Sequence, residues 1–194
     1  MRLEICLPIY NEASILTQSV TKTFLFCEKH FPNYDWSIVL LINGSSDDSE
    51  KIAKELSADY SHIRVIVYAE GGKGRTLRRY ILESAADVLV YMDADLAVDL
   101  EKLPDLITPI AEYRADITIG NRFHSNSLVE RGLFREIQSR CYSYLSRFLF
   151  WQPFHDLQCG FKALRPSVFK RIADNVVNTG WFFDTEFIVC AHKQ

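Results

Sequence analysis

Short, almost entirely apolar segments alternate with helical segments through residues 1–120, and this alternation limits the folds open to the chain. Ser37–Ile42 reads Ser-Ile-Val-Leu-Leu-Ile, a pattern typical of a strand buried on both faces of a parallel sheet. Further strands are expected at Leu3–Ile9, Ile63–Tyr68, Val88–Met92 and Ile117–Gly120. Strands that alternate with helices at this spacing indicate βαβ units. We therefore predict a single-domain α/β fold whose mostly parallel sheet is flanked by helices.

Helices are expected between these strands and after them. The predicted ranges are 13–31, 47–61, 75–85, 100–113 and 128–150, with a short helix from residue 166. Ser46 or Asp47 is the expected N-cap of the second helix. The sequence ends inside what reads as a further helix after Glu186. We therefore expect residues 1–194 to form one catalytic-type domain with its C-terminal continuation missing.

Composition and charge narrow the function classes. Apolar residues make up 48% and charged residues 24%, which is ordinary for a soluble globular chain. The net charge of −3 argues against nucleic acid as a partner. The five cysteines contain no CxxC pair and indicate packing thiols in a reducing compartment. No apolar run approaches the ~20 residues that span a bilayer. We expect a cytoplasmic protein, with peripheral contact at the cytoplasmic face of a membrane left open.

Four polar loops follow the predicted strands at their carboxyl ends, where open parallel sheets bind ligands. These loops are Pro8–Glu12, Asn43–Ser45, Gly72–Gly74 and Asp93–Asp95. The two carboxylates of the last loop leave a buried strand only two residues apart, so they repel each other unless a cation compensates. Hard oxygen ligands suit Mg²⁺ or Mn²⁺. A metal site at Asp93 and Asp95 is therefore predicted, with a solvated turn or helix cap as the alternative.

Basic side chains beside glycines or strand ends are candidate phosphate ligands. Lys73 lies between two glycines, whose backbone N–H groups can approach a phosphate. A P-loop is rejected because position 67 is not a glycine. Arg122 follows a predicted strand, and an arginine fork matches phosphate oxygens. An ordinary glycine turn and a surface arginine remain the alternatives for these two sites.

The later part of the chain carries a second set of candidates. Arg131, Arg135 and Arg140 lie in the predicted long helix and form either a cationic wall for an anionic acceptor or a solvated face. The aromatic segment 148–154 follows, and together these features favour a lipid phosphate at a membrane surface. The remaining acidic candidates for catalysis are Asp156, Asp184 and Glu186, with helix capping as the alternative for Asp184.

Several motifs occur in one order along the whole chain. They are Pro8-Ile9-Tyr10-Asn11-Glu12, Asn43-Gly44-Ser45-Ser46-Asp47, Gly72-Lys73-Gly74, Met92-Asp93-Ala94-Asp95-Leu96, Gly120-Asn121-Arg122, Gln158-Cys159-Gly160-Phe161-Lys162 and Trp181-Phe182-Phe183-Asp184-Thr185-Glu186. In this set the chain resembles family-two inverting glycosyltransferases of the GT-A fold. The resemblance is greatest to the branch of dolichyl-phosphate mannose and glucose synthases and bacterial polyprenyl-phosphate sugar synthases.

The resemblance implies a metal-dependent transfer of a hexose from UDP-glucose or GDP-mannose to a polyprenyl or dolichyl phosphate. It also implies a role for each motif. Donor contacts are expected from Pro8, Tyr10, Glu12, Asn43, Lys73, Asp93 and Arg122. Asp95, together with Asp93, would hold Mg²⁺ or Mn²⁺. Asp156, Asp184 and Glu186 would lie near the sugar or acceptor, and Arg131, Arg135 and Arg140 near the acceptor.

One departure from the family pattern bears on activity. Many relatives have an acid where this chain has Ile42, and an isoleucine cannot make the base contact expected of that acid. A glycosyltransferase-like module that binds a nucleotide sugar without turnover is therefore the alternative. A sugar-1-phosphate nucleotidyltransferase is disfavoured because the glycine-rich G-x-G-T-R opening is missing from the sequence.

Overall fold

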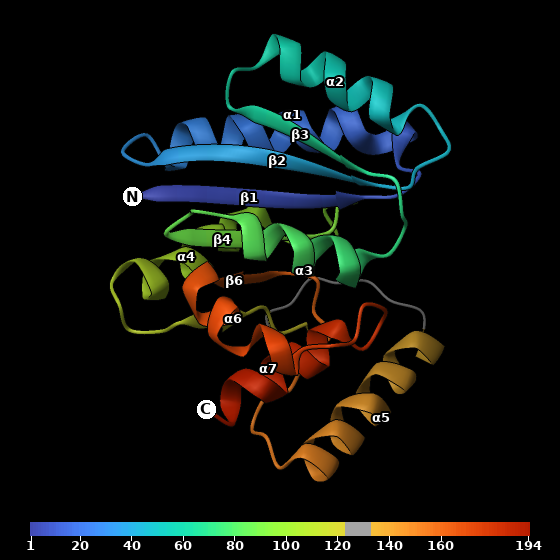
Figure 1. The fold of residues 1–194 in the computed structure, drawn as a ribbon, viewed down its shortest axis with the longest axis vertical. Helices are drawn as coiled ribbons and strands as arrows, with labels where there is room; N and C mark the ends of the chain where they lie inside the picture. Colours follow the sequence, from blue (N-terminus) through green and yellow to red (C-terminus); the bar gives the residue numbers. More distant parts are fainter. Residues whose placement is uncertain (123–132) are drawn as a thin grey trace.

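The computed structural model describes the backbone of residues 1–122 and 133–194, and the side chains of residues 1–122 and 141–194. A six-stranded sheet lies in the middle of the molecule (Figure 1), with its strands in the order β3-β2-β1-β4-β6-β5. Its strands are β1 (Arg2–Ile9), β2 (Asp35–Asn43), β3 (Ile63–Tyr68), β4 (Val88–Tyr91), β5 (Ile117–Ile119) and β6 (Lys162–Leu164).

The sheet is mostly parallel, as predicted. β1 pairs in parallel with β2 and β4, and β2 pairs in parallel with β3. β6 is antiparallel to both of its neighbours, β4 and β5. The register places Ile5 beside Ile38 on one side and Val90 on the other. The carboxyl ends of the parallel strands therefore meet at one edge of the sheet, which confirms the α/β fold class.

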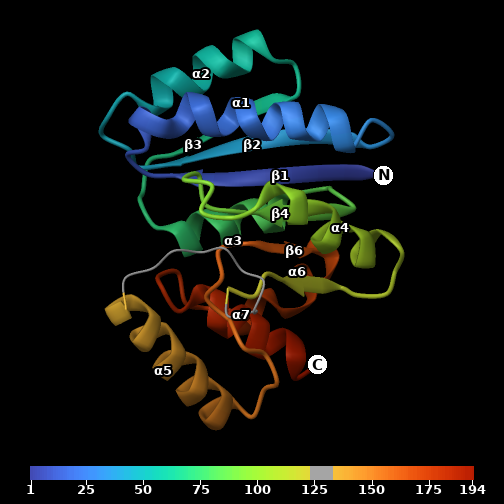
Figure 2. The same ribbon diagram turned by 180° about the vertical axis from the view of Figure 1, so that it is seen from behind.

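Helices cover both faces of the sheet (Figures 1 and 2). On one face α1 (Ala13–His30), α2 (Ser49–Asp59) and α4 (Leu103–Ala111) pack in one apolar cluster with strand residues such as Ile5. On the other face α3 (Lys73–Glu83), α6 (Pro166–Ile172) and α7 (Phe183–His192) pack with alternate strand residues such as Cys6. This alternation is the period of two that a strand imposes.

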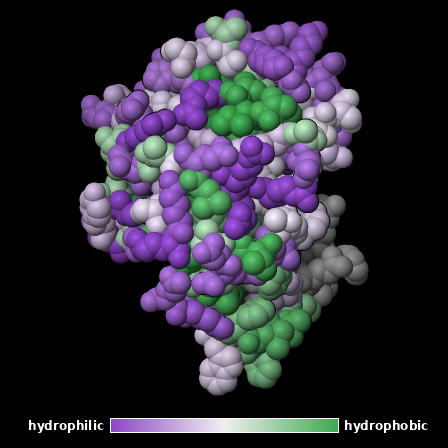
Figure 3. Space-filling view, in the orientation of Figure 1, coloured by the Kyte–Doolittle hydropathy of each residue, from purple (hydrophilic) through white to green (hydrophobic). Residues whose placement is uncertain are grey.

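Helix α5 (Leu133–Phe150) lies apart from the sheet, at the end of the molecule opposite α2 (Figures 1 and 2). Two short 3₁₀ turns, η1 (Leu100–Lys102) and η2 (Ala173–Asn175), complete the described elements. Hydrophobic residues gather on the surface over α5 (Figure 3). Within the described residues, no helix has both the length and the apolarity to cross a bilayer.

Two predictions of secondary structure need correction, and one strand was missed. β6 was not predicted, because it is only three residues long and begins with a lysine. The second helix starts at Ser49 with Asp48 as its N-cap, although Asp47 Oδ1 does accept the Ser49 N–H at 3.0 Å. The predicted helix 100–113 is a 3₁₀ turn followed by α4, which ends at Ala111 after the internal Pro109. The predicted start of the long helix at Leu128 lies outside the described residues.

Candidate active site

The loop after β1 is held against the loop after β2 by side-chain to backbone hydrogen bonds. Asn11 adopts a positive φ of 55° and its Oδ1 accepts the Ser46 N–H at 2.8 Å. The Glu12 N–H donates to Ser49 Oγ at 2.9 Å. Short polar residues make these bonds readily, since asparagine tolerates the left-handed region and serine caps backbone groups. Glu12 is thereby fixed at the edge of the sheet.

The loop after β2 in turn contacts the loop after β3. Asn43 is buried, and its Oδ1 accepts the Gly72 N–H at 3.3 Å. Gly44 has a φ of +72°, and a Cβ there would lie 2.8 Å from the Gly71 nitrogen, so only glycine fits this approach. Ile42 is buried in the core and cannot serve as a polar ligand. Three of the four predicted loops therefore touch one another in succession.

Lys73 and Asp93 form an ion pair between Nζ and Oδ1, which joins the loop after β3 to the loop after β4. Both side chains are about half-exposed, at 37% and 46%. Burial works against the charged form of Lys73, but the Asp93 and Asp184 carboxylates prevail and raise its pKa. The backbone at Gly160 lies against the same carboxylate, since a Cβ there would be 2.1 Å from Asp93 Oδ2.

Asp95 is exposed beside this pair, and its Oδ1 accepts the Ala97 N–H at 3.0 Å. Glu12 lies close enough to feel the neighbouring acids: burial first, and then the charges of Asp95, Asp47 and Asp93, raise its pKa. Carboxylates from the loops after β1, β2 and β4 therefore share one region of negative potential. Such a region attracts a cation.

These residues fit a hard divalent cation in the manner usual for Mg²⁺. Asp93 and Asp95 offer only oxygen ligands, and Mg²⁺ is commonly held by one or two carboxylates with substrate phosphates completing its shell. Among the described residues no cluster of three or more His, Cys, Asp or Glu side chains could hold a metal by itself. The two carboxylates fit the arrangement in which phosphate oxygens complete the shell of the ion.

Arg122 and Asp156 form a forked ion pair. Nε and Nη2 of Arg122 donate to the two carboxylate oxygens, each at 2.6 Å, and the Arg122 backbone N–H donates to Oδ2 at 3.0 Å. Asp156 is buried, at 5% exposure, and the guanidinium compensates its charge. The two residues were predicted separately, as a phosphate ligand and a catalytic acid. The structure brings them together.

Asp184 lies at the start of α7, where three groups fix its carboxylate. Tyr91 Oη and Lys162 Nζ each donate to Oδ1 at 2.6 Å, and Lys73 acts on it through its charge. Burial opposes ionisation, but the two lysines prevail and lower the pKa of Asp184. The N-cap of α7 is Phe182, so the capping alternative for Asp184 is wrong. The carboxylate is thus held in its ionised form.

Lys162 is the residue of this site that sequence reasoning missed. It is fully buried in β6, donates to the Cys159 carbonyl at 2.5 Å and lies over the Tyr91 ring at 5.5 Å. A lysine between Phe161 and Ala163 is the signal that was available, because a lysine in an apolar strand needs an acidic partner. Lys162 and Lys73 therefore alternate with the acids Asp184 and Asp93 along one row of charges.

Glu186 contacts the loop before α7. Its Oε2 accepts the Asn178 N–H at 2.7 Å, which fixes the loop before α7. That loop packs against α3, because a Cβ on Gly74 would lie 2.8 Å from the Thr179 carbonyl oxygen. Glu186 therefore holds the segment that brings α7 to Lys73, and its predicted catalytic role stays a prediction.

The remaining predicted residues are placed less fully. Pro8 is buried at the end of β1 and Tyr10 is exposed just beyond it. Arg131 lies outside the described residues. Arg135 and Arg140 belong to α5, but their side chains are also outside the described part of the chain. The acceptor role of these arginines stays a prediction.

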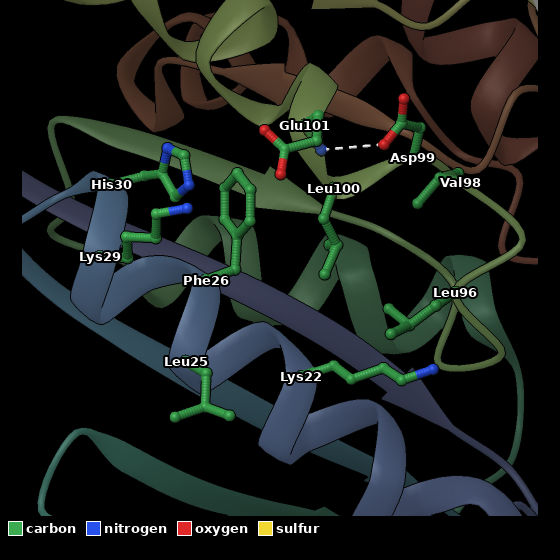
Figure 4. A pocket seen from close by; sticks show the side chains of 10 residues that line it. All are labelled: Lys22, Leu25, Phe26, Lys29, His30, Leu96, Val98, Asp99, Leu100 and Glu101. Carbon is green, nitrogen blue, oxygen red and sulfur yellow. Dashed lines mark hydrogen bonds between the residues drawn. The ribbon is translucent and has the colours of Figure 1, made fainter.

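A groove of about 530 Å³ lies between α1 and residues 96–101 (Figure 4). Lys22 and Lys29 line it from α1, opposite Asp99 and Glu101. The Asp99 carboxylate caps the 3₁₀ turn η1, since it accepts the Glu101 N–H at 3.0 Å. Because this groove contains no predicted donor or catalytic residue, we place the candidate active site at the sheet edge instead.

The fold is that of GT-A glycosyltransferases. Glucosyl-3-phosphoglycerate synthase from Mycobacterium tuberculosis, solved with UDP, superposes with a TM-score of 0.67 over 96% of this chain and 63% of that chain, at 19% identity. S. aureus TarS superposes with a TM-score of 0.63 over 96% of this chain and 55% of that chain, at 16% identity. Likeness at this level of identity establishes the fold.

The chain belongs to glycosyl transferase family 2, whose pattern matches residues 4–173. It is 31% identical to glycosyltransferase AglD of Haloferax volcanii over 194 residues. This alignment covers all of this chain and 31% of AglD. It is 28% identical over 206 residues to the dolichyl-phosphate β-glucosyltransferase of Drosophila melanogaster, covering all of this chain and 63% of that protein. The chain thus spans less than two thirds of the curated relatives it matches.

Proposed function

We propose that the chain carries the catalytic site of a metal-dependent, inverting hexosyltransferase. Its donor is a nucleotide diphosphate sugar of the UDP-glucose or GDP-mannose type, and its acceptor is a polyprenyl or dolichyl phosphate. The observation that carries the proposal is the row of alternating charges Asp93, Lys73, Asp184 and Lys162 at the carboxyl edge of the sheet. This arrangement sets a carboxylate for a metal, a cation for phosphate and an ionised acid side by side.

The donor side of the site is assigned to the loops after β3 and β4. Asp93 and Asp95 would hold Mg²⁺ or Mn²⁺, which when bound would supply Lewis acidity toward the diphosphate. Lys73 adds a positive charge at the start of α3, where backbone N–H groups also favour anions. Mn²⁺ is present in a solved complex of the M. tuberculosis synthase with UDP, which supports a divalent ion here.

The acceptor side is assigned to Asp156, Asp184 and the part of α5 around Tyr142 and Ser143, which contact Thr185 and His155. An acceptor phosphate oxygen forms a bond to the anomeric carbon while the bond from that carbon to the diphosphate oxygen breaks, which inverts the configuration. A phosphate monoester has its second pKa at ~6, so it is largely ionised at neutral pH and needs little help from a base. The names of the Drosophila, mouse and human relatives support a dolichyl phosphate acceptor and a glucosyl donor.

A binding module without turnover is the second candidate, and the burial of Ile42 favours it. That side chain is buried and apolar, so it cannot make the base contact that the family resemblance leads us to expect from an acid at this position. Calorimetry with nucleotide sugars, followed by an assay for transfer and hydrolysis, separates the two functions. A module binds the donor and yields neither product.

The test of the proposed function is transfer of radiolabelled sugar from UDP-glucose or GDP-mannose to polyprenyl phosphate in the presence of Mn²⁺. Product is expected with the wild-type chain and not with Asp95→Ala. Asp105→Ala is the matched control, since Asp105 forms an exposed pair with Lys102 at 3.4 Å. Transfer by Asp95→Ala at the wild-type rate would show that Asp95 is not needed as a metal ligand. Binding of the donor by the wild-type chain without any transfer would favour the binding module over the enzyme.

A further inference from the structure

We infer that Leu96 is a positioning residue for the metal site, because its strained backbone, held in place by its packed side chain, orients the carboxylate of Asp95. Leu96 directly follows Asp95 in the loop after β4 and has a φ of 49°. The inference rests on the proposed function, since it takes Asp95 as a ligand of the divalent ion. It adds to that function a residue that carries no ligand atom itself.

The backbone of Leu96 lies in the left-handed region, which leucine rarely adopts. In the described part of the chain, the non-glycine residues with positive φ are Asn11, Leu96, Tyr113 and Trp151. Asparagine tolerates this region, whereas the Cβ of a leucine there comes too close to the following carbonyl oxygen. Strain of this kind persists only where the surrounding structure fixes it, and it gathers at functional sites. Its place beside a predicted metal ligand therefore points to a role.

Packing of the side chain holds Leu96 in this conformation. Leu96 is partly buried against the apolar cluster that contains Phe26 of α1 and Ala94 of the same loop. Figure 4 shows Leu96 on the loop that faces α1, where it lines the groove together with Phe26 and Leu100. The Leu96 N–H also donates to the Asp93 carbonyl oxygen at 3.2 Å, which closes a turn over residues 93–96. The apolar contacts and the turn together offset the strain.

The conformation of Leu96 sets the direction of the next backbone N–H. Asp95 is exposed, and its Oδ1 accepts the Ala97 N–H at 3.0 Å. Leu96 is the residue between these two groups, so its φ decides whether they meet. Among the described residues no side chain or backbone group donates to Asp95 Oδ2. One carboxylate oxygen is thus fixed by the loop, and the other stays open to a cation.

Packing alone is the other role that Leu96 can have, and small residues at position 96 distinguish the two roles. Alanine keeps the Cβ that disfavours a positive φ but loses the packing that offsets the strain, so the loop should relax. Glycine loses the same packing but adopts a positive φ without steric cost. The Asp95 carboxylate should therefore move in Leu96→Ala and keep its place in Leu96→Gly.

The test is titration of Mn²⁺ in the presence of UDP, followed by electron paramagnetic resonance. Leu96→Ala is expected to bind Mn²⁺ about tenfold more weakly than the wild type, and Leu96→Gly to recover most of this loss. Tyr113 is the matched control position, because it has a φ of 58° between α4 and β5 and is 83% exposed. Tyr113→Ala and Tyr113→Gly should both bind Mn²⁺ like the wild type.

Two results of this titration overturn the inference. One is binding by Leu96→Ala equal to that of the wild type. The other is equal weakening in Leu96→Ala and Leu96→Gly, because packing alone then explains the loss. Val98→Ala removes a neighbouring side chain from the same groove and apolar cluster, and it should bind like the wild type. A loss in Val98→Ala as large as that in Leu96→Ala also overturns the inference.

A wild-type chain that binds no Mn²⁺ with UDP would remove the metal from the proposed function. Crystal structures of Leu96→Ala and Leu96→Gly then decide the inference separately. Leu96→Ala is expected to lose the hydrogen bond from the Ala97 N–H to Asp95 Oδ1, and Leu96→Gly is expected to keep it. The same loop conformation in both variants would overturn the inference.

Discussion

Lys162 Nζ lies 2.6 Å from Asp184 Oδ1, and the lysine is fully buried while the aspartate side chain is 15% exposed. A buried ion pair gains little over an apolar pair, but removal of one partner leaves a desolvated charge without compensation. The pair also ties β6, the antiparallel strand, to the start of α7. Asp184 therefore depends on Lys162 both for its position and for its charge.

We predict that Lys162→Met lowers the free energy of unfolding by about 3–5 kcal/mol at neutral pH. The pKa of Asp184 is lowered in the native chain, so the pair stabilises fully above the unfolded value of ~3.9 and loses its effect as the pH falls through the native value. In the variant Asp184 can take up a proton at mildly acidic pH, so the loss should shrink there. Urea unfolding at several pH values measures this. The double variant Lys162→Met/Asp184→Asn should recover part of the stability, and an equal loss at every pH would contradict the account.

Gly160→Ala should disturb the donor site with little effect on the fold. Its Cβ would lie 2.1 Å from Asp93 Oδ2, so the carboxylate must move and its pair with Lys73 must change. We expect the affinity for UDP with Mn²⁺, measured by calorimetry, to fall at least tenfold. Gly180→Ala is the control, since its Cβ meets nothing closer than 3.6 Å. Equal affinity of the two variants would show that Asp93 is not held against residue 160.

Arg122→Lys should destabilise the chain although it keeps the positive charge. A lysine cannot form the fork that Arg122 makes with the buried Asp156, so one carboxylate oxygen loses its donor. We expect a loss of about 1–3 kcal/mol in the free energy of unfolding. Arg114→Lys removes a similar contact with Glu112 at an exposed site and should change stability by less than ~1 kcal/mol. Two equal losses in urea unfolding would mean that the fork itself does not stabilise the chain.

The parallel part of the fold could be predicted because its strands are continuous apolar runs. The range predicted for β3 matches its observed bounds, Ile63–Tyr68. β6 could not be predicted, since three residues that begin with a lysine carry no periodic signal and gain their order from pairing with β4 and β5. Strand pairing of this kind is a tertiary effect that overrides local preference.

The sequence predicted the individual residues of the candidate site but not the ion pairs that they form. The sequence indicates that Lys73 and Asp93 belong to loops at one edge of the sheet, because both follow buried strands. It does not show that the lysine bonds the aspartate, or that Arg122 takes Asp156 as its partner. The second pairing depends on the segment before β6, which comes to β4 from a distant part of the chain together with Gly160 and Lys162.

The most direct test of the central claim is electron paramagnetic resonance of Mn²⁺ titrated into the protein with and without UDP. Bound Mn²⁺ loses the sharp signal of the free hydrated ion. We predict that UDP strengthens Mn²⁺ binding to the wild type, because the diphosphate completes the oxygen shell offered by Asp93 and Asp95, and that Asp95→Ala abolishes this gain while Asp105→Ala keeps it. A UDP-dependent gain in Asp95→Ala equal to that of the wild type would contradict the account.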